Sequence, residues 1–248
     1  MQFHHYRFRP KLIPTLVTLA TLPILVSFGL WQSNKADQKQ ALQDTYDARA
    51  SQSAVRITSG HLSPEEFRYK KVVVRGQFDT ANQILLDNQV YNEAAGYHVI
   101  TPFQIESSRV YILVNRGWVP LGADRAVLPK ISTPEGMLEI GGIATLPPSK
   151  IYELMQPESL NGGWQTIWQN MDLERYREAV PFQLQPVIIQ MDKDSQGGFV
   201  REWPRPDTRI QTHLGYAFQW FGMAVILVLF YVVTNFKKIT ETETDKND

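Results

Sequence analysis

The stretch THLGYAFQWFGMAVILVLFYVVT, Thr212 to Thr234, begins with polar and aromatic residues and ends in an apolar run. Between Gly215 and Val233 it holds nineteen residues without a charge. About twenty apolar residues let an α-helix cross a hydrocarbon core of roughly 30 Å. The stretch therefore predicts a transmembrane helix over 213–234, with a histidine, an amide and several aromatic rings at one end.

A second uncharged run, the twenty residues Leu12–Trp31, lies near the N-terminus and predicts another transmembrane helix over 12–32. Prolines inside a span, such as Pro23, are tolerated in membranes. The alternative is a cleaved signal peptide, because VSFG at Val26–Gly29 offers small residues near its end. The run is long for a signal peptide and lacks an A-x-A site, which favours the span.

Basic residues lie just before the first apolar run and just after the second. Under the positive-inside rule, a stub over 1–11 and a tail over 235–248 face the cytoplasm, and 33–212 lies outside. No long Arg/Ser-rich presequence precedes the first run, so a bacterial inner membrane with a periplasmic domain is expected. The flanking basic residues are Arg7, Arg9, Lys11, Lys237 and Lys238.

The outer segment predicts one compact, β-rich, barrel-like domain, so the fold class is membrane α plus β-rich α+β. A polar helix over 34–50 opens it, Ser63 and Glu66 predict a capping box, and Asp172 predicts the N-cap of a helix to Val180. Short runs rich in Val, Ile and aromatic residues predict strands. They cover 72–78, 83–87, 97–105, 109–119, 138–146 and 186–192.

Composition excludes several classes of function. The net charge is zero, so nucleic acid is not an expected partner. The absence of cysteine excludes disulfides, iron–sulfur clusters and thiolate zinc sites. No nucleophile elbow, H-E-x-x-H, P-loop or dinucleotide motif occurs. We therefore expect no enzyme.

The start of the second span is the candidate site. On a helix His213, Tyr216 and Trp220 share a face, while Gln219 points to a neighbouring side about 9 Å deeper than His213. One interpretation is an interfacial aromatic belt with a hydrated histidine. The other is a shallow ligand site, in which the imidazole coordinates a metal and aromatic faces pack on a flat macrocycle.

Arginines upstream of the second span, at 201, 205 and 209, could hold carboxylates near the membrane surface. Arg209 is one helical turn from His213. Ordinary contact with lipid head groups is the alternative interpretation of all three.

Trp31 and Gln32 end the first span at the same membrane interface. Gly29, just before them, is small enough to let a second helix approach closely. We expect the spans to pair, bringing Trp31 and Gln32 close to His213.

The order of the motifs FGLWQ, VVVRGQFD, GYHVITPF, ILVNRGWVP and HLGYAFQWFGMA resembles that of the Surfeit locus protein 1 family of cytochrome c oxidase assembly factors, over nearly the whole chain. The resemblance implies a non-catalytic role, in which haem a is held transiently and passed to the largest oxidase subunit, near the haem a synthase. It implies that His213 is an axial ligand of the haem iron, packed by Tyr216 and Trp220. Gln32, a partner subunit or water remain alternatives for a second ligand. A structural clamp that never touches haem is the alternative function.

The NRGW element follows the most apolar strand. Gly117 suggests a tight turn, and Asn115 a local hydrogen bond to the backbone. The other interpretation is a partner-docking loop, since Arg116 and Trp118 are residue types enriched at interface hot spots.

Overall fold

The computed structural model describes residues 6–122, 127–147, 164–206 and 209–238. The chain forms two compact units. One comprises Met1–Asp44 together with Arg205–Asp248, and the other comprises Thr45–Pro204. The two units are described separately below.

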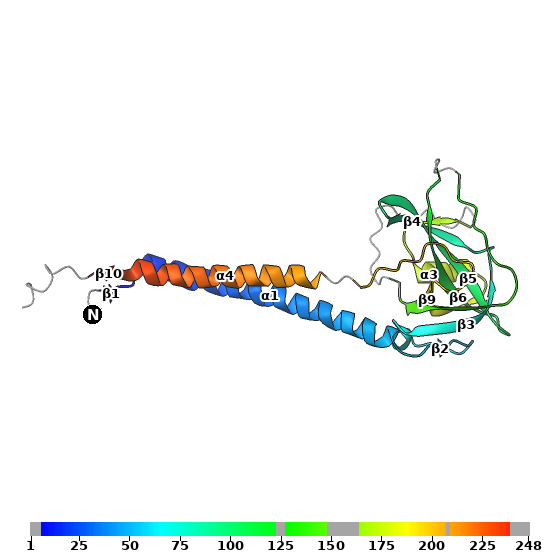
Figure 1. Ribbon diagram of the computed structural model, residues 1–248, viewed down its shortest axis with the longest axis horizontal. Helices are drawn as coiled ribbons and strands as arrows, with labels where there is room; N and C mark the ends of the chain where they lie inside the picture. Colours follow the sequence, from blue (N-terminus) through cyan, green and yellow to red (C-terminus); the bar gives the residue numbers. More distant parts are fainter. Residues whose placement is uncertain (1–5, 123–126, 148–163, 207–208, 239–248) are drawn as a thin grey trace, which may run out of the picture. The chain divides into compact units, whose positions relative to one another are not determined.

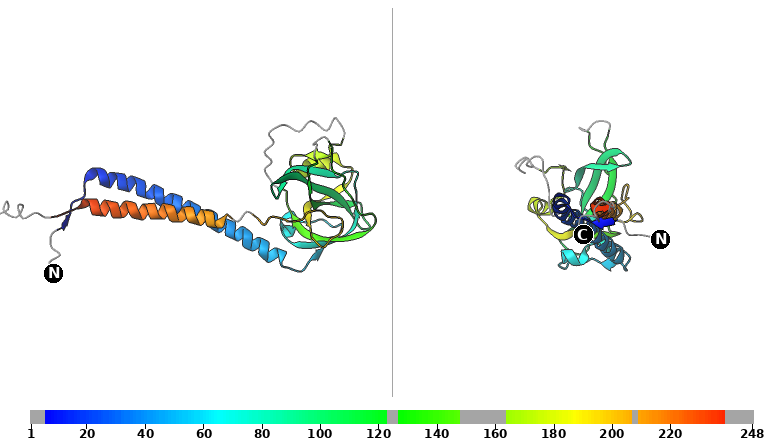
Figure 2. Two further views of the ribbon diagram at one scale, coloured as in Figure 1. Left: turned by 45° about the horizontal axis from the view of Figure 1, so that its top comes forward. Right: turned by 90° about the vertical axis from the view of Figure 1, so that its left-hand side faces the viewer.

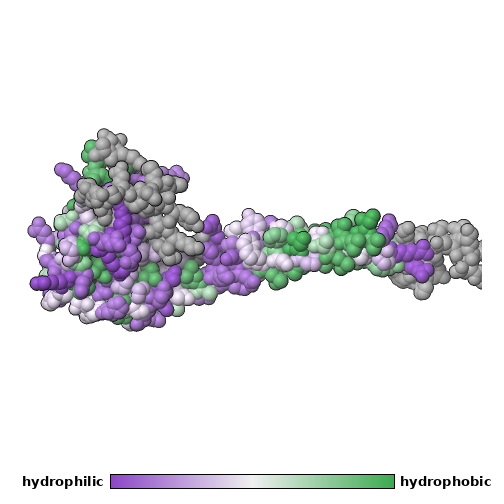
Figure 3. Space-filling model, turned by 180° about the vertical axis from the view of Figure 1, so that it is seen from behind, coloured by the Kyte–Doolittle hydropathy of each residue, from purple (hydrophilic) through white to green (hydrophobic). Residues whose placement is uncertain are grey.

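The first unit is a pair of helices, α1 (Leu12–Ala50, of which the part to Asp44 belongs here) and α4 (Ile210–Asn235). They run side by side in opposite directions (Figures 1 and 2). Both are long and apolar enough to cross a membrane. Hydrophobic surface covers their paired segments in the space-filling view (Figure 3). The surface that faces outward from the pair is therefore suited to lipid.

A clasp joins the helices at the end near the chain termini. Strand β1 (Tyr6–Phe8) pairs antiparallel with β10 (Phe236–Lys238). Beside it, the buried side chain of Asn235 accepts a hydrogen bond from the backbone N–H of Lys11 at 2.9 Å and donates to the carbonyl of Tyr231 at 2.7 Å. The first of these bonds satisfies an N–H at the start of α1 that has no partner within its own helix.

The first predicted span and the polar helix after it are one element. Helix α1 continues without a break for 39 residues, from the apolar run into the polar segment that ends at Ala50. No glycine or proline interrupts the polar part, and straight-chain residues there favour helix.

The second unit contains a closed barrel of five strands (Figure 1). Around the ring the order is β3, β7, β9, β6 and β5, and β3 closes it by pairing with β5 between Gly76–Phe78 and Phe103–Ile105. Only β6 and β9 run parallel within the ring. The barrel confirms the predicted fold class. The ring strands are β3 (Lys71–Phe78), β5 (Ala94–Ile105), β6 (Val110–Pro120), β7 (Leu138–Thr145) and β9 (Gln183–Met191).

Further elements extend the sheet or cover it. Strands β4 (Ile84–Tyr91) and β8 (Ile167–Trp168) continue from β5, and β2 (Val55–Arg56) lies beside β3. Helices α2 (Pro64–Phe67) and α3 (Leu173–Ala179) are short. The six predicted strands are all present, whereas β2 and β8 were not predicted, because two-residue strands carry no periodicity.

Alternating side chains of the ring strands fill the barrel. Strand β3 alternates buried Val72 and Val74 with more exposed residues, as expected for a strand with one face inward. A second cluster, containing Trp168 and Tyr176, packs α3 against β4, β5 and β9. The barrel interior is formed chiefly by Val72, Val74, Phe103, Ile112, Val114, Ile140, Val187 and Ile189.

The two predicted helix caps had different outcomes. Asp172 caps α3 as expected, accepting hydrogen bonds from the N–H groups of Glu174 and Arg175. The prediction of a capping box was wrong. Ser63 occupies the N-cap of α2, but its side chain makes no hydrogen bond there. Glu66 pairs instead with Lys70, one turn along the chain, at 3.1 Å.

Candidate functional site

The predicted site residues His213 and Gln32 are in contact. Nδ1 of His213, in the first turn of α4, lies 2.8 Å from Oε1 of Gln32 on α1. Both side chains are partly buried. A polar pair thus joins the helices where each apolar run gives way to polar sequence.

Small residues bring the two helices close enough for this contact. A Cβ on Gly29 would lie 2.6 Å from the ring of Phe221, so only glycine fits there without a shift of that ring. Ala217 and Ala224 on α4 are buried, and they lie on the helix face that also carries His213. The prediction that Gly29 permits a close approach is confirmed.

Below the polar pair, Trp220 stacks on Phe28 of α1. Their ring centroids lie 4.9 Å apart and the planes meet at 25°. Phe28 is one turn before Gln32, and Trp220 is about two turns from His213. One face of the indole is therefore covered by Phe28, and the Trp220 side chain as a whole is partly buried.

Two other predicted site residues point outward. Tyr216 is 49% exposed and Trp31 is 52% exposed. Neither takes part in the Gln32–His213 contact. Their exposure in a helix pair of this kind fits an interfacial aromatic position as well as contact with a ligand.

The upstream arginines divide between the two units. Arg209 is the N-cap residue of α4, is exposed, and its carbonyl accepts from the N–H of His213 at 3.2 Å. Arg201 belongs to the barrel unit, where its guanidinium donates to the carbonyls of Asp192, Lys193 and Ser195. Arg201 therefore holds a turn of the barrel unit through these contacts. Arg205, in the helix unit, is exposed.

The NRGW element lies inside strand β6 rather than in a turn after it. The predicted turn was wrong, because pairing with β5 continues through Trp118, opposite His98. Gly117 has a φ of +117°, which glycine adopts most easily, and its N–H donates to Oδ1 of Asn115 at 3.2 Å. The predicted local hydrogen bond is thus present.

Arg116 is fully buried. Its guanidinium donates to the carbonyls of Gly197 at 2.7 Å and Ser132 at 2.6 Å, and to Oγ1 of Thr133 at 2.8 Å. It also lies between the rings of Phe78 and Phe199, 4.7 and 5.0 Å from their centroids.

Burial lowers the pKa of Arg116 to about 10, so the side chain stays charged at neutral pH. Asn115 and Trp118 are each only 8% exposed. This burial favours the structural interpretation of NRGW over a docking loop.

His98, opposite this element on β5, is tied to it. Nδ1 of His98 lies 3.3 Å from Nδ2 of Asn115, and its ring meets that of Trp203 edge-on. Desolvation by burial lowers its pKa to about 4, so it is neutral at physiological pH. It therefore serves as a hydrogen-bonding residue of the barrel.

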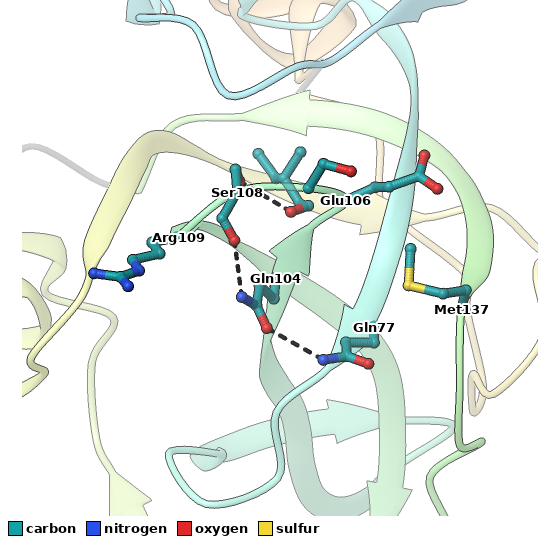
Figure 4. Close-up of a pocket in the computed structure, with 8 residues that line it drawn as sticks. Gln77, Gln104, Glu106, Ser108, Arg109 and Met137 are labelled. Carbon is teal, nitrogen blue, oxygen red and sulfur yellow. Dashed lines mark hydrogen bonds between the residues drawn. The ribbon is translucent and has the colours of Figure 1, made fainter.

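A shallow polar hollow of about 590 Å³, which the sequence did not indicate, lies on the barrel (Figure 4). Nε2 of Gln77 donates to Gln104, whose own Nε2 donates to the carbonyl of Ser108. Glu106 pairs with Arg75 at 3.3 Å. These polar groups bind one another, and no nucleophile–base pair is present among the described lining residues. Across the described part of the chain, no group of three His, Asp or Glu is placed to hold a metal ion.

Comparison with known proteins gives one consistent result. The SURF1 family matches residues 19–225. A SURF1-like protein of Rickettsia felis is 25% identical, covering 88% of this chain and 95% of its own length. Surfeit locus protein 1 of Xenopus tropicalis is 27% identical over 86% of this chain and 71% of its own. A SURF1-like protein of Caenorhabditis elegans is 26% identical over 87% and 72%.

Proposed function

Since the chain belongs to the SURF1 family, we propose that it is an assembly factor for the haem–copper cytochrome c oxidase, which holds haem a transiently and assists its insertion into the largest oxidase subunit. The resemblance of its motifs to those of oxidase assembly factors supports the first part. The geometry of the helix pair supports the second.

The observation that carries the haem proposal is the contact between His213 and Gln32. It uses Nδ1 of the imidazole, and Nε2 has no hydrogen-bond partner among the described residues. A neutral imidazole with one nitrogen bonded to an oxygen acceptor and the other available is how histidine usually binds metals. Nε2 of His213 is accordingly the proposed axial ligand of the haem iron.

The residues around His213 suit a flat, largely apolar ligand with anionic ends. The stacked pair Phe28 and Trp220 offers aromatic surface on the membrane side. Arg209, one turn from His213 toward the polar end of α4, is placed to pair with a propionate carboxylate. Tyr216 and Trp31 are exposed and can pack on the edge of the macrocycle.

Transient holding requires modest affinity. Haem that is held by one histidine on an open helix surface dissociates more readily than haem held by two axial ligands inside a closed cavity. The proposed partners are therefore proteins that hand haem over or accept it, namely the haem a synthase and the largest oxidase subunit.

The proposed location is a bacterial inner membrane, with both termini in the cytoplasm and the barrel in the periplasm. The basic residues Arg7 and Arg9 before α1, and Lys237 and Lys238 after α4, support this orientation through the positive-inside rule. The His213 site then lies at the periplasmic face of the membrane.

The test is to purify the full chain from cells that make haem a, and to compare wild type with His213→Ala. We expect haem absorbance in the wild type, at least about tenfold less in the variant, and reduced oxidase haem content in the variant strain. His61→Ala is the matched control, since His61 is an exposed histidine of the barrel unit. A haem-free wild type, with full oxidase activity in the His213→Ala strain, would instead favour a structural clamp.

A further inference from the structure

The amide of Gln32 meets only one of the two ring nitrogens of His213. The atom facing Nδ1 is the carbonyl oxygen Oε1, at 2.8 Å. An amide oxygen has no proton to give, so the hydrogen in this contact lies on Nδ1. In a neutral imidazole the lone pair then lies on Nε2.

We infer that Gln32 is a positioning residue, which fixes His213 as its Nδ1–H tautomer and presents Nε2 as the single ring nitrogen able to ligate iron. This inference rests on the proposed function for the identity of the ligand. The tautomer itself is a property of the helix pair, and it holds whether or not haem binds.

The surroundings of the Gln32–His213 contact strengthen the effect of this hydrogen bond on the tautomer of His213. Both side chains are partly buried against each other, at the point where the apolar runs of the two helices begin. At low local dielectric a hydrogen bond is stronger than in water, and a tautomer that leaves Oε1 without a donor is correspondingly disfavoured. The partner amide therefore selects the proton position as well as the ring orientation.

The helix packing holds Gln32 in place. Gly29 and Phe28 both lie about one turn before Gln32. Gly29 lies against the ring of Phe221, and Phe28 stacks on Trp220. The distance between Gln32 and His213 is therefore set by contacts deeper in the pair, on the same two helices.

His98 shows the opposite arrangement within the same chain. There Oδ1 of Asn115 accepts from the N–H of Gly117, so the amide nitrogen Nδ2 faces Nδ1 of His98. Nδ1 of His98 must accept, and its proton lies on Nε2. In both cases the side-chain amide that faces the imidazole sets its tautomer, and of these two histidines His213 is the one whose Nε2 is unprotonated.

This assignment separates Gln32 from the alternative role of second axial ligand. The carbonyl oxygen that would bind iron is the one that accepts from Nδ1. An oxygen held against Nδ1 lies on the side of the ring away from Nε2, so it cannot also bind an iron that Nε2 ligates unless it leaves Nδ1.

The first experiment needs no haem. Full-length protein labelled with ¹⁵N-histidine is placed in lipid nanodiscs at neutral pH, and the His213 signals are identified by their loss in His213→Ala. We expect ¹⁵N shifts of a protonated Nδ1 and an unprotonated Nε2, and a shift toward the Nε2–H form in Gln32→Leu. A wild type in the Nε2–H form would overturn the inference.

The second experiment uses ferric haem b (hemin) as the probe. Gln32→Leu should bind hemin about 10- to 100-fold more weakly, as for other partners of metal-ligating histidines. Gln32→Glu, which keeps an oxygen acceptor, should retain binding and raise the iron–histidine stretching frequency in resonance Raman spectra of the ferrous form. Ser33→Ala, the neighbouring position on α1, should match wild type.

The outcomes separate the two proposals. A Nδ1–H wild type that binds no hemin refutes the haem proposal and leaves the tautomer assignment standing. Unchanged affinity in Gln32→Leu, or a change from six-coordinate to five-coordinate iron in that variant, overturns the positioning role. Equal losses in Gln32→Leu and Gln32→Glu also overturn it, because they mean that the amide only supports the fold.

Discussion

Gly29 of α1 lies against the ring of Phe221 of α4, so closely that a Cβ at position 29 would be 2.6 Å from that ring. This contact sets the spacing of the helices about one turn from Gln32 on α1 and about two turns from His213 on α4. The Gln32–His213 contact depends on this spacing.

Gly29→Leu should separate the helices and weaken the Gln32–His213 contact, because overpacking costs about 1–3 kcal/mol. The chain has no cysteine, so a Gln32→Cys, His213→Cys pair can be cross-linked without background. We expect cross-linking at least about tenfold slower when Gly29→Leu is added. Gly222→Leu is the control, because a Cβ there meets nothing within 4 Å. Equal rates in the two would contradict this role for Gly29.

Asn235→Ala should loosen the end of the helix pair near the termini. It removes the acceptor of the Lys11 N–H, and an unsatisfied buried donor costs about 1–3 kcal/mol. Hydrogen exchange of the 6–15 segment in the full chain should accelerate about tenfold or more. Thr234→Ala is the matched control, since Thr234 is exposed and bonds only within its own helix. Unchanged exchange would show that the clasp holds without Asn235.

Arg116→Met should destabilise the barrel by about 3 kcal/mol, because it leaves several buried acceptors without their donor. Arg116→Lys should lose much of the same stability, since an ammonium cannot reproduce the planar fork between two rings. Urea unfolding of the full chain in detergent, followed by near-UV circular dichroism, measures both. Arg109→Met, at an exposed position, should change stability by less than about 0.5 kcal/mol. A stable Arg116→Met would contradict the structural role.

Barrel stability should fall as pH drops from about 6.5 toward 4 because of His98. Its pKa in the folded chain is lowered to about 4, so the unfolded chain binds the proton first and is favoured on acidification. The stabilisation is complete above pH 6.5 and amounts to no more than about 3 kcal/mol. The difference in unfolding free energy between wild type and His98→Gln, measured from pH 7 to 4, isolates this group from other titrating residues. A difference that does not vary with pH would show that His98 titrates normally.

The sequence was sufficient to predict both apolar helices, the six main strands and the α3 cap. Those elements follow from local patterns, namely an uncharged run, alternation and a short polar side chain before a helix. The two-residue strands and the β1–β10 clasp were not predicted, because they exist only through pairing with distant segments. The turn at NRGW was mispredicted for a related reason. Gly117 does adopt a positive φ, but β5 continues to pair with the strand around it.

The site was predictable as a set of residues and not as an arrangement. Aromatic and polar residues at the ends of two apolar runs pointed to Gln32, His213 and Trp220. Which imidazole nitrogen meets the amide, and that Trp220 stacks on Phe28, depend on how the two helices are rotated against each other. The full burial of Arg116 was likewise invisible, since arginine is almost never fully buried unless paired.

The sequence separation of the helix contacts has a consequence for how the protein is made. Gln32 meets His213 across 181 positions, and Lys11 meets Asn235 across 224. During synthesis the first helix and the whole barrel leave the ribosome before the second helix exists. The imidazole and its amide partner can therefore meet only late in translation, and a product that ends before His213 lacks the pair.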